Sequence, residues 1–351
     1  MITRVLSLNP SKQILFKSLA LSLGAILLLT MPSIVKSAYV LHMIIMIIIY
    51  VPLALSQNLI TGFTGMLTMG QAAFYGLGAY TSALLVMKLG LPWPMAFLAA
   101  GIVAALFGIV VGFPCLRVGS DYLTLMTIGF GAIFSAVATN WVAVTRGSMG
   151  IPGVPPPSIG PFVFNTLPST YYLYLAIAIA CYFFMYRLTQ SHIGRALLAI
   201  REDEIAASTM GINLAYYKVL AFTFGAMWAG FAGSMLAHLL NFVGPQSFTL
   251  DESLLHVQIA ILGGFASLPG SVIGAAIMVS LPQIFQDIYQ YRMLLNGILL
   301  LLLMALRPQG LMGSSAMGKS SGFSVPKKLR GRLFRNRQSE KDSRSTPLKI
   351  Q

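Results

Sequence analysis

The chain has 351 residues, of which 56% are apolar and only 9% are charged, and its formal net charge is +14. This balance excludes an ordinary soluble protein, because soluble domains carry about 25% charged residues, and it predicts a membrane protein. The positive charge is local, because ten of the 23 Lys and Arg residues lie after residue 318. A basic tail beside a membrane indicates a cytoplasmic segment near anionic lipid. We therefore expect contact with membrane lipid and no binding of nucleic acid.

The first half of the chain predicts five membrane spans. Residues 1–17 are polar and basic, and an apolar run follows to residue 31. We interpret this run as an uncleaved first span rather than a signal peptide, because the cleavage site is poor and a second span follows at once. Positive charge before the first span places the N-terminus in the cytoplasm. The next four spans are expected at about 38–57, 57–87, 93–114 and 121–143.

Polar side chains at membrane depth distinguish the third predicted span, 57–87. Asn58, Thr64 and Gln71 lie there among glycines, which themselves predict close helix contacts. Such polar groups must face protein or water, because lipid offers them no hydrogen bonds. Two interpretations of Asn58 and Gln71 stay open: hydrogen bonds between helices, or positions along a solute pathway.

The second half of the chain predicts three more spans, at about 170–187, 218–240 and 291–306. The loop 145–170 is rich in Gly and Pro and poor in Lys and Arg, so it belongs outside. With this orientation, the basic tail reaches the cytoplasm only if the apolar segment 256–285 does not cross the membrane.

The segment 256–285 is broken at the sequence LGGFASLPGS, which contains Gly263 and Gly264. Two half-helices that enter and leave on the same side explain both the break and the charge distribution. Irregular backbone at membrane depth is tolerated where it lines a cavity, so both glycines are further pathway candidates. The expected fold is all-α: a polytopic membrane helical bundle with about eight spans plus a re-entrant half-helix pair, and with both termini in the cytoplasm.

The segment 188–217, between the sixth and seventh spans, predicts a folded cytoplasmic element. Within ten positions it holds five charged residues: Arg195, Arg201, Glu202, Asp203 and Glu204. Asp203 is suited to cap a helix start, and Gly211 follows residues 205–210 as a helix stop. Short amphipathic helices at a membrane surface are typical of surfaces that dock a partner.

No motif in the sequence predicts enzymatic chemistry. Residues 313–320 read GSSAMGKS and fit a phosphate-binding loop, but the strand and helix that such a loop needs are missing. The four histidines lack the spacing of metal ligands, and the adjacent Asp251 and Glu252 have no companion nucleophile. We therefore expect no catalytic residue, no metal and no cofactor. The spans also lack a series of acidic residues for proton relay, which argues against a secondary transporter.

Hydropathy and charge divide the chain into three parts. Residues 1–13 are expected to form a cytoplasmic N-terminal segment, and residues 14–312 the transmembrane domain, with the docking loop 188–217 inserted in it. Residues 313–351, rich in Ser, Lys and Arg, predict a disordered cytoplasmic tail.

Four stretches of the chain carry a family resemblance. The two longer ones are NLITGFTGMLTMGQAAFYGLGAYTSALL at 58–85 and GRALLAIREDEIAASTMGIN at 194–213. The two shorter ones are ILGGFASLPGSVIGA at 261–275 and RPQGLMG at 307–313. In this order they resemble the permeases of bacterial ABC importers of the branched-chain amino acid type, the LivM/LivH family. Residues 194–213 correspond to the loop that contacts the ATPase subunit in these permeases.

The resemblance implies that residues 14–312 form a permease domain in the bacterial inner membrane. It implies three kinds of partner: a second homologous permease subunit, two ABC ATPase subunits inside, and a periplasmic substrate-binding protein outside. ATP hydrolysis would then lie in separate subunits, and this chain would not be an enzyme. Glu204, Ala207 and Gly211 would form the docking contact, although Ile205 separates Glu204 from the alanine pair of the general importer pattern.

Branched-chain amino acids are the substrates that the resemblance implies. Urea or short amides are the alternative, because urea permeases belong to the same family, and Gln71 stands where the family leads us to expect His. A stand-alone secondary transporter is the alternative from another class, and dependence on an ATPase separates the two classes.

Overall fold

The computed structural model describes residues 30–33, 35, 37–115 and 120–284, together with single residues between 294 and 312. All of them belong to one compact unit, Met1–Gly313, and the second unit, Ser314–Gln351, lies outside the described residues. The described part is helical apart from its loops and two pairs of two-residue strands. This confirms the all-α prediction.

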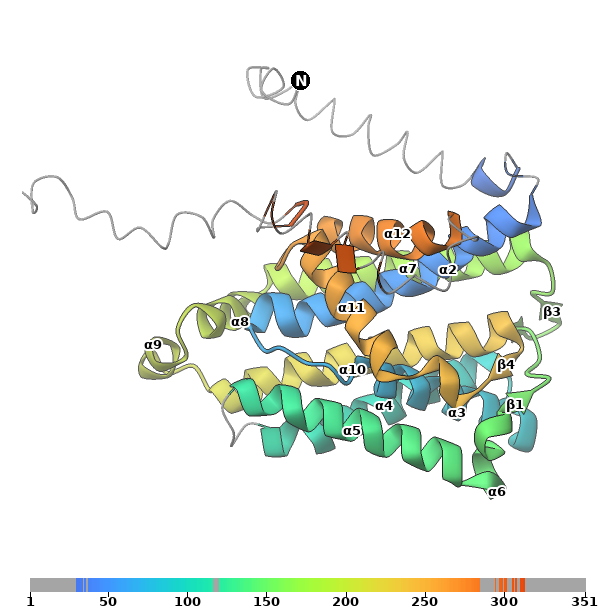
Figure 1. Ribbon diagram of the computed structural model, residues 1–351, viewed down its shortest axis with the longest axis horizontal. Helices are drawn as coiled ribbons and strands as arrows, with labels where there is room; N and C mark the ends of the chain where they lie inside the picture. The colour runs from blue at the N-terminus through green and yellow to red at the C-terminus, as the bar shows by residue number, and fades with distance from the viewer. Residues whose placement is uncertain are drawn as a thin grey trace, which may run out of the picture. The chain divides into compact units, whose positions relative to one another are not determined.

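Six of the described helices are long and apolar enough to cross a membrane, and they lie side by side (Figure 1). They are Ala38–Phe63, which combines α2 (Ala38–Gln57) with η2 (Asn58–Phe63), α3 (Gln71–Leu89), α4 (Trp93–Cys115), α5 (Ser120–Asn140), α7 (Leu167–Gln190) and α10 (Leu214–Leu240). The chain is therefore a multi-pass membrane protein. The first and last expected spans fall mostly outside the described residues, so the total of eight stays a prediction.

The other elements connect the spans or pack beside them. They are α6 (Val142–Thr145), η3 (Gly147–Met149), β1 (Ile151–Pro152), β2 (Ser158–Ile159), β3 (Phe162–Val163), α8 (His192–Glu202), α9 (Glu204–Thr209), β4 (Phe242–Val243), η4 (Pro245–Ser247), α11 (Leu250–Gly263) and α12 (Leu268–Ile284). β1 pairs antiparallel with β4, and β2 pairs with β3.

Helix α10 packs closely against α3 because both helices place glycines at the contact. A Cβ atom added to Gly78 would lie 2.1 Å from the carbonyl oxygen of Gly230. One added to Gly233 would lie 2.0 Å from the carbonyl oxygen of Tyr75. Only glycine allows the two backbones to approach this far, which confirms the helix contacts predicted from the glycine-rich spans.

The boundary between the second and third spans was predicted wrongly. Helix α2 continues into the π-helical turn η2, so Asn58 lies in the last part of the second span, which ends at Phe63, instead of beginning the third. Gly65 then has a φ of +77°, a left-handed conformation that ends the helix. α3 begins only at Gln71, after the non-helical residues 65–70. A polar, glycine-rich stretch thus forms a turn between two spans, not the first turns of a long one.

The segment that was predicted to be broken forms a helical hairpin. Close contacts pair Gly263 with Gly270 and Ile259 with Gly274, so α11 and α12 run antiparallel from a turn at 264–267. α11 has 14 residues and a length of about 21 Å. It is therefore too short to cross a hydrocarbon core of about 30 Å, as a re-entrant half-helix requires.

Helix α11 begins earlier than the predicted start of this segment at residue 256. Its first turn contains Asp251 and Glu252. Acidic side chains stabilise the first turn because they face the positive end of the helix dipole.

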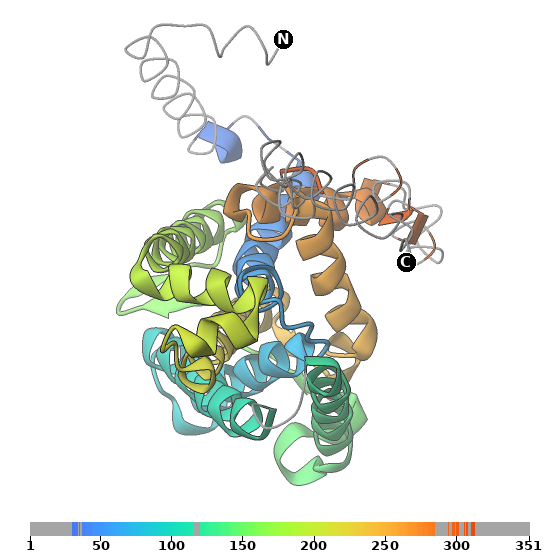
Figure 2. The ribbon, with the colours of Figure 1, turned by 90° about the vertical axis from the view of Figure 1, so that its left-hand side faces the viewer.

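The connecting elements lie at two opposite ends of the spans. The strand pairs and α6 lie at one end, on the right of Figure 1, and α8 and α9 lie at the other, which faces the viewer in Figure 2. The hairpin turn lies at the α8 end, because the guanidinium of Arg201 is 5.7 Å from the ring centre of Phe265.

Candidate docking surface and buried polar junction

Local capping interactions build the helix pair α8–α9 at one end of the spans. The hydroxyl of Ser191 accepts a hydrogen bond from the Ile193 amide at 3.1 Å, which begins α8. The carboxylate of Asp203 accepts from the amides of Ile205 (2.8 Å) and Ala206 (3.0 Å), which begins α9. Gly211 has a φ of +83° just beyond α9. The cap and the stop predicted from the sequence are both confirmed.

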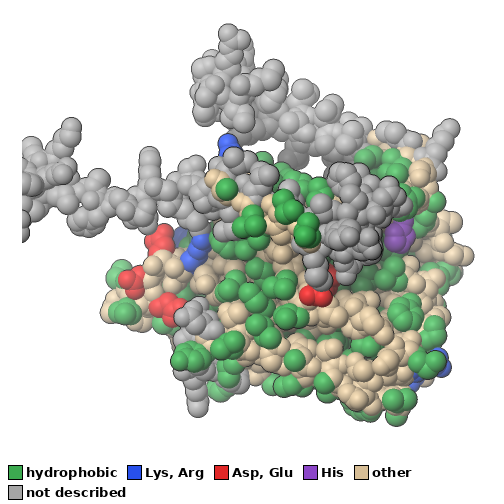
Figure 3. Space-filling model, in the orientation of Figure 1, with side chains coloured by type: hydrophobic (Ala, Val, Ile, Leu, Met, Phe, Trp, Pro, Cys, Tyr) green, Lys and Arg blue, Asp and Glu red, His purple; other side chains and the backbone are tan. Residues whose placement is uncertain are grey.

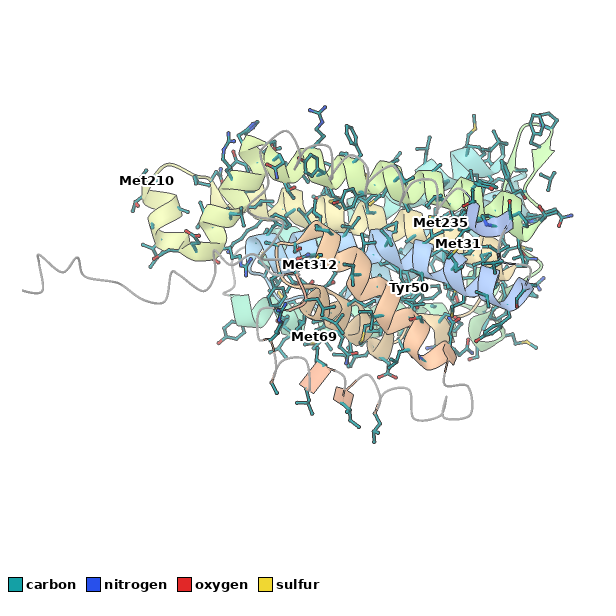
Figure 4. All side chains as sticks on the ribbon, turned by 90° about the horizontal axis from the view of Figure 1, so that it is seen from above. Met31, Tyr50, Met69, Met210, Met235 and Met312 are labelled. Carbon is teal, nitrogen blue, oxygen red and sulfur yellow. The ribbon has the colours of Figure 1, made fainter. Side chains whose placement is uncertain are left out.

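The outer surface of α9 carries apolar side chains that the chain itself does not cover. Ile205 is 77% exposed and Met210 is 83% exposed, and Met210 lies at the tip of the helix pair (Figure 4). Ala207 is only 4% exposed and anchors α9 inward. We call the surface formed by Glu204, Ile205, Met210 and Gly211 the α9 surface. An apolar patch of this kind, at a helix end, is typical of partner docking.

Acidic side chains surround this apolar patch. Glu202, Asp203 and Glu204 are exposed, and Figure 3 shows acidic side chains gathered over α8 and α9. Glu204 forms an ion pair with Lys218 of α10 at 2.6 Å. Since the Glu204 side chain is 45% exposed, this pair contributes little to stability. It orients the start of α9 toward α10, and Arg195 adds an exposed positive charge on α8.

Arg201 differs from the other charged residues of the loop because it points inward. Its guanidinium donates a hydrogen bond to the carbonyl oxygen of Gly62 in η2 and stacks over Phe265 in the hairpin turn. Burial lowers the pKa of the Arg201 guanidinium, and Glu202 partly offsets this shift. Arg201 therefore connects α8 to both η2 and the hairpin turn.

A buried polar junction centred on Asn58 lies next to Arg201. The Asn58 amide donates to the Ser271 hydroxyl at 2.6 Å and to the Ser267 carbonyl at 3.0 Å. Its side-chain oxygen accepts from the Ala266 amide at 3.0 Å. Asn58 is fully buried, so it joins the second span to the hairpin turn by hydrogen bonds between helices. The hydrogen bonds between helices expected for Asn58 are therefore present, and its position along a solute pathway stays a prediction.

Hydrogen bonds and close backbone contacts hold the other predicted pathway residues, and their role in a pathway stays a prediction. The Gln71 amide donates to the Ser56 hydroxyl at 2.7 Å and to the Gly225 carbonyl at 3.3 Å. Thr64 bonds back to the Ile60 carbonyl within its own helix. Gly263 and Gly264 form the tight end of α11, and Gly264 has a φ of +102°.

Sequence reasoning missed several parts of this junction. Gln57 is buried and donates to Thr61 at 2.8 Å and to the Thr68 carbonyl at 3.0 Å. The backbone amides of Leu311 and Met312 donate to the carbonyls of Leu262 (2.9 Å) and Gly263 (3.1 Å). The sequence signal for the contacts of Leu311 and Met312 is that both contacting segments, 261–275 and 307–313, belong to the four stretches that carry the family resemblance.

Among the described residues, six apolar spans with a charged helix pair at one end define a multi-pass membrane protein. Residues 39–306 match the family described as branched-chain amino acid transport system / permease component. The chain belongs to this family, as the resemblance of its four stretches predicted.

The relatives with curated names agree with the family. The chain is 36% identical over 290 residues to the high-affinity branched-chain amino acid transport system permease protein LivM of Salmonella typhimurium, covering 76% of this chain and 68% of that protein. LivM of Escherichia coli K12 is also 36% identical, over 75% of this chain and 68% of its own length. LivH of Salmonella typhimurium is 26% identical over 77% of this chain and 93% of its own length. No solved structure matches the chain.

Proposed function

We propose that this chain is a permease subunit of an ATP-driven importer that moves branched-chain amino acids across the inner membrane. The family match over residues 39–306 carries this proposal. The substrate is inferred from the relatives, whose names specify branched-chain amino acid transport. Similarity to both LivM and LivH supports assembly with a second, homologous permease subunit.

The distribution of charge supports a cytoplasmic position for the α8 end. Of the described Lys and Arg residues, five lie at or near this end and two at the other. The five are Arg187, Arg195, Arg201, Lys218 and Arg307, and the two are Lys88 and Arg146. Loops rich in Lys and Arg stay in the cytoplasm. The strand pairs then lie on the periplasmic side, where a soluble binding protein delivers the substrate.

In this orientation the α9 surface faces the cytoplasm and is available to an ATPase subunit. Glu204 and Gly211 contribute to the contact, and the buried Ala207 holds α9 in place beneath it. When the ATPase changes shape, α8 moves with α9, and Arg201 transmits the motion to η2 and the hairpin turn.

Substitution of Gly211 tests this assignment. Nothing lies within 4 Å of a Cβ atom added to Gly211, so Gly211→Trp projects a large side chain from the α9 surface without filling the core. We expect loss of ATPase association and of leucine uptake in membranes that contain the complete importer. Gly160→Trp is the matched control, because Gly160 also has a positive φ of +60° and open surroundings but lies at the other end.

The control must retain ATPase association. If Gly211→Trp also retains association and uptake, the α9 surface is not the docking site. Uptake by the purified chain alone, without ATP, would instead support the stand-alone transporter. Uptake of urea in place of leucine by the complete importer would favour the amide alternative.

A further inference from the structure

A cavity of about 410 Å³ opens between α2, α10, α11 and α12, among residues that the docking mechanism does not use. Its volume lies in the range of about 300–1,000 Å³ that is typical of small-molecule sites. Tyr50 of α2 lies in its wall, where α2 passes beside α12 (Figure 4). Gln246 and Gln283 line it at the end of the spans opposite α8. The cavity is therefore on the side from which the proposed orientation delivers the substrate.

One wall of the cavity is acidic and polar. The hydroxyl of Tyr50 donates a hydrogen bond to the carboxylate of Glu252. His256 Nε2 lies 3.4 Å from the same carboxylate oxygen, and the His256 ring packs edge-on against both Tyr50 and Tyr75. Asp251, next along α11, adds a second carboxylate at the rim. Lys and Arg are absent from the described lining, so the wall favours a cation.

Tyr75 supplies an independent indication of a ligand. It is 1% exposed and lines the cavity. Within the part of the chain that the structure describes, its hydroxyl has no hydrogen-bond partner. A buried hydroxyl without a partner is unfavourable, because it has lost water and gained nothing in return. A ligand atom in the cavity, beside Glu252, would satisfy it.

The remaining lining is apolar or neutral. Met46, Leu255, Met278 and Val279 form an aliphatic surface, and the amides of Gln258 and Gln283 provide hydrogen-bond donors. The lining therefore suits a molecule that has three parts: a cation beside Glu252, an aliphatic body against the methionines, and a hydrogen-bond acceptor near the amides. That molecule is an amino acid with an aliphatic side chain.

We propose that this cavity is an amino acid binding site of the permease, in which Glu252 and Tyr75 receive the substrate ammonium group. The ammonium donates hydrogen bonds to the Glu252 carboxylate and to the Tyr75 hydroxyl oxygen, while Tyr50 holds the carboxylate in place. This inference rests on the proposed function, because it assigns a contact to the proposed substrate. It places selectivity for an amino group in the permease itself, in addition to any selection by a soluble binding protein.

Binding of 3-methylbutylamine, which keeps the ammonium and the aliphatic chain of leucine, tests the site directly. The dissociation constant is measured by calorimetry on the purified complete importer without the soluble binding protein. We expect Glu252→Gln to weaken binding at least about tenfold, because a hydrogen bond to a charged group is lost. Tyr75→Phe, which removes only one oxygen, weakens binding by a smaller factor. 4-Methylpentanoate, which lacks the amino group, binds more weakly than the amine to the unmodified importer.

Asp251→Asn is the matched control, because it removes one negative charge from the adjacent, exposed carboxylate. If Glu252 contacts the ammonium group, Asp251→Asn weakens binding of the amine less than Glu252→Gln does. Three results would overturn the site: equal weakening by Asp251→Asn and Glu252→Gln, tighter binding of the carboxylate analogue, or no binding of the amine. If Glu252→Gln does not fold, Tyr75→Phe decides, and unchanged amine binding by that variant rejects the site.

Leucine uptake by the same unmodified importer separates the two proposals. Uptake without amine binding rejects this site and leaves the proposed function in place. Absence of leucine uptake by the unmodified importer rejects the proposed function, whether or not the amine binds.

Discussion

Replacement of Asn58 by leucine removes the centre of the polar junction while keeping a branched side chain of similar shape. Three of its hydrogen bonds have short distances: 2.6 Å to Ser271, 3.0 Å to the Ser267 carbonyl and 3.0 Å from the Ala266 amide. Hydrogen bonds between helices in a membrane contribute about 1 kcal/mol each. Asn58→Leu should therefore lower the free energy of unfolding by about 3 kcal/mol.

The free energy of unfolding is measured by titration of the purified protein with denaturing detergent. Asn140→Leu is the matched control, because the hydrogen bond that the structure gives the Asn140 amide, to the Ala136 carbonyl at an exposed position, stays within its own helix. We expect a change below about 0.5 kcal/mol for this control. Equal changes for the two variants would refute the role of Asn58 as the junction between the second span and the hairpin turn.

Two further substitutions test the coupling and the helix packing. Arg201→Lys keeps the charge but loses the planar stack on the hairpin turn, so it should reduce substrate-stimulated ATP hydrolysis severalfold, whereas Arg187→Lys at an exposed position should not. Equal rates for the two variants would exclude Arg201 as the coupling residue. Gly78→Ala places a Cβ atom 2.1 Å from the Gly230 carbonyl oxygen and should destabilise the protein by about 1–3 kcal/mol, measured by the same detergent titration. Gly129→Ala, which meets no atom within 4 Å, is its control, and a loss of similar size there would contradict the packing argument.

The parts of the site that local sequence determines could be predicted. The apolar spans follow from hydropathy alone. Asp203 and Gly211 begin and end α9 through interactions within a few residues of themselves, so their pattern was sufficient. The break in the hairpin was also predictable, because Gly263 and Gly264 interrupt an apolar run.

The parts that depend on contacts between distant segments could not be predicted. Asn58 meets Ser271 across 213 positions, and nothing in the sequence near Asn58 indicates this partner. Arg201 belongs to a charged run whose other members are exposed, so its inward direction is visible only in the fold. The end of the second span was misplaced for a related reason, because a π-helical turn at Asn58 gives no hydropathy signal of its own.

The position of α9 against an ATP-hydrolysing subunit is the central claim, and site-directed cross-linking at Ile205 tests it most directly. Ile205 is 77% exposed on the α9 surface, so the cysteine of Ile205→Cys remains accessible to a short bifunctional reagent in inside-out membrane vesicles from cells that express the complete importer. The proposed function predicts one dominant product that contains the ATPase subunit and that depends on the cysteine at this position. Reaction of the same cysteine with a reagent confined to the periplasm, with no ATPase product, would contradict it.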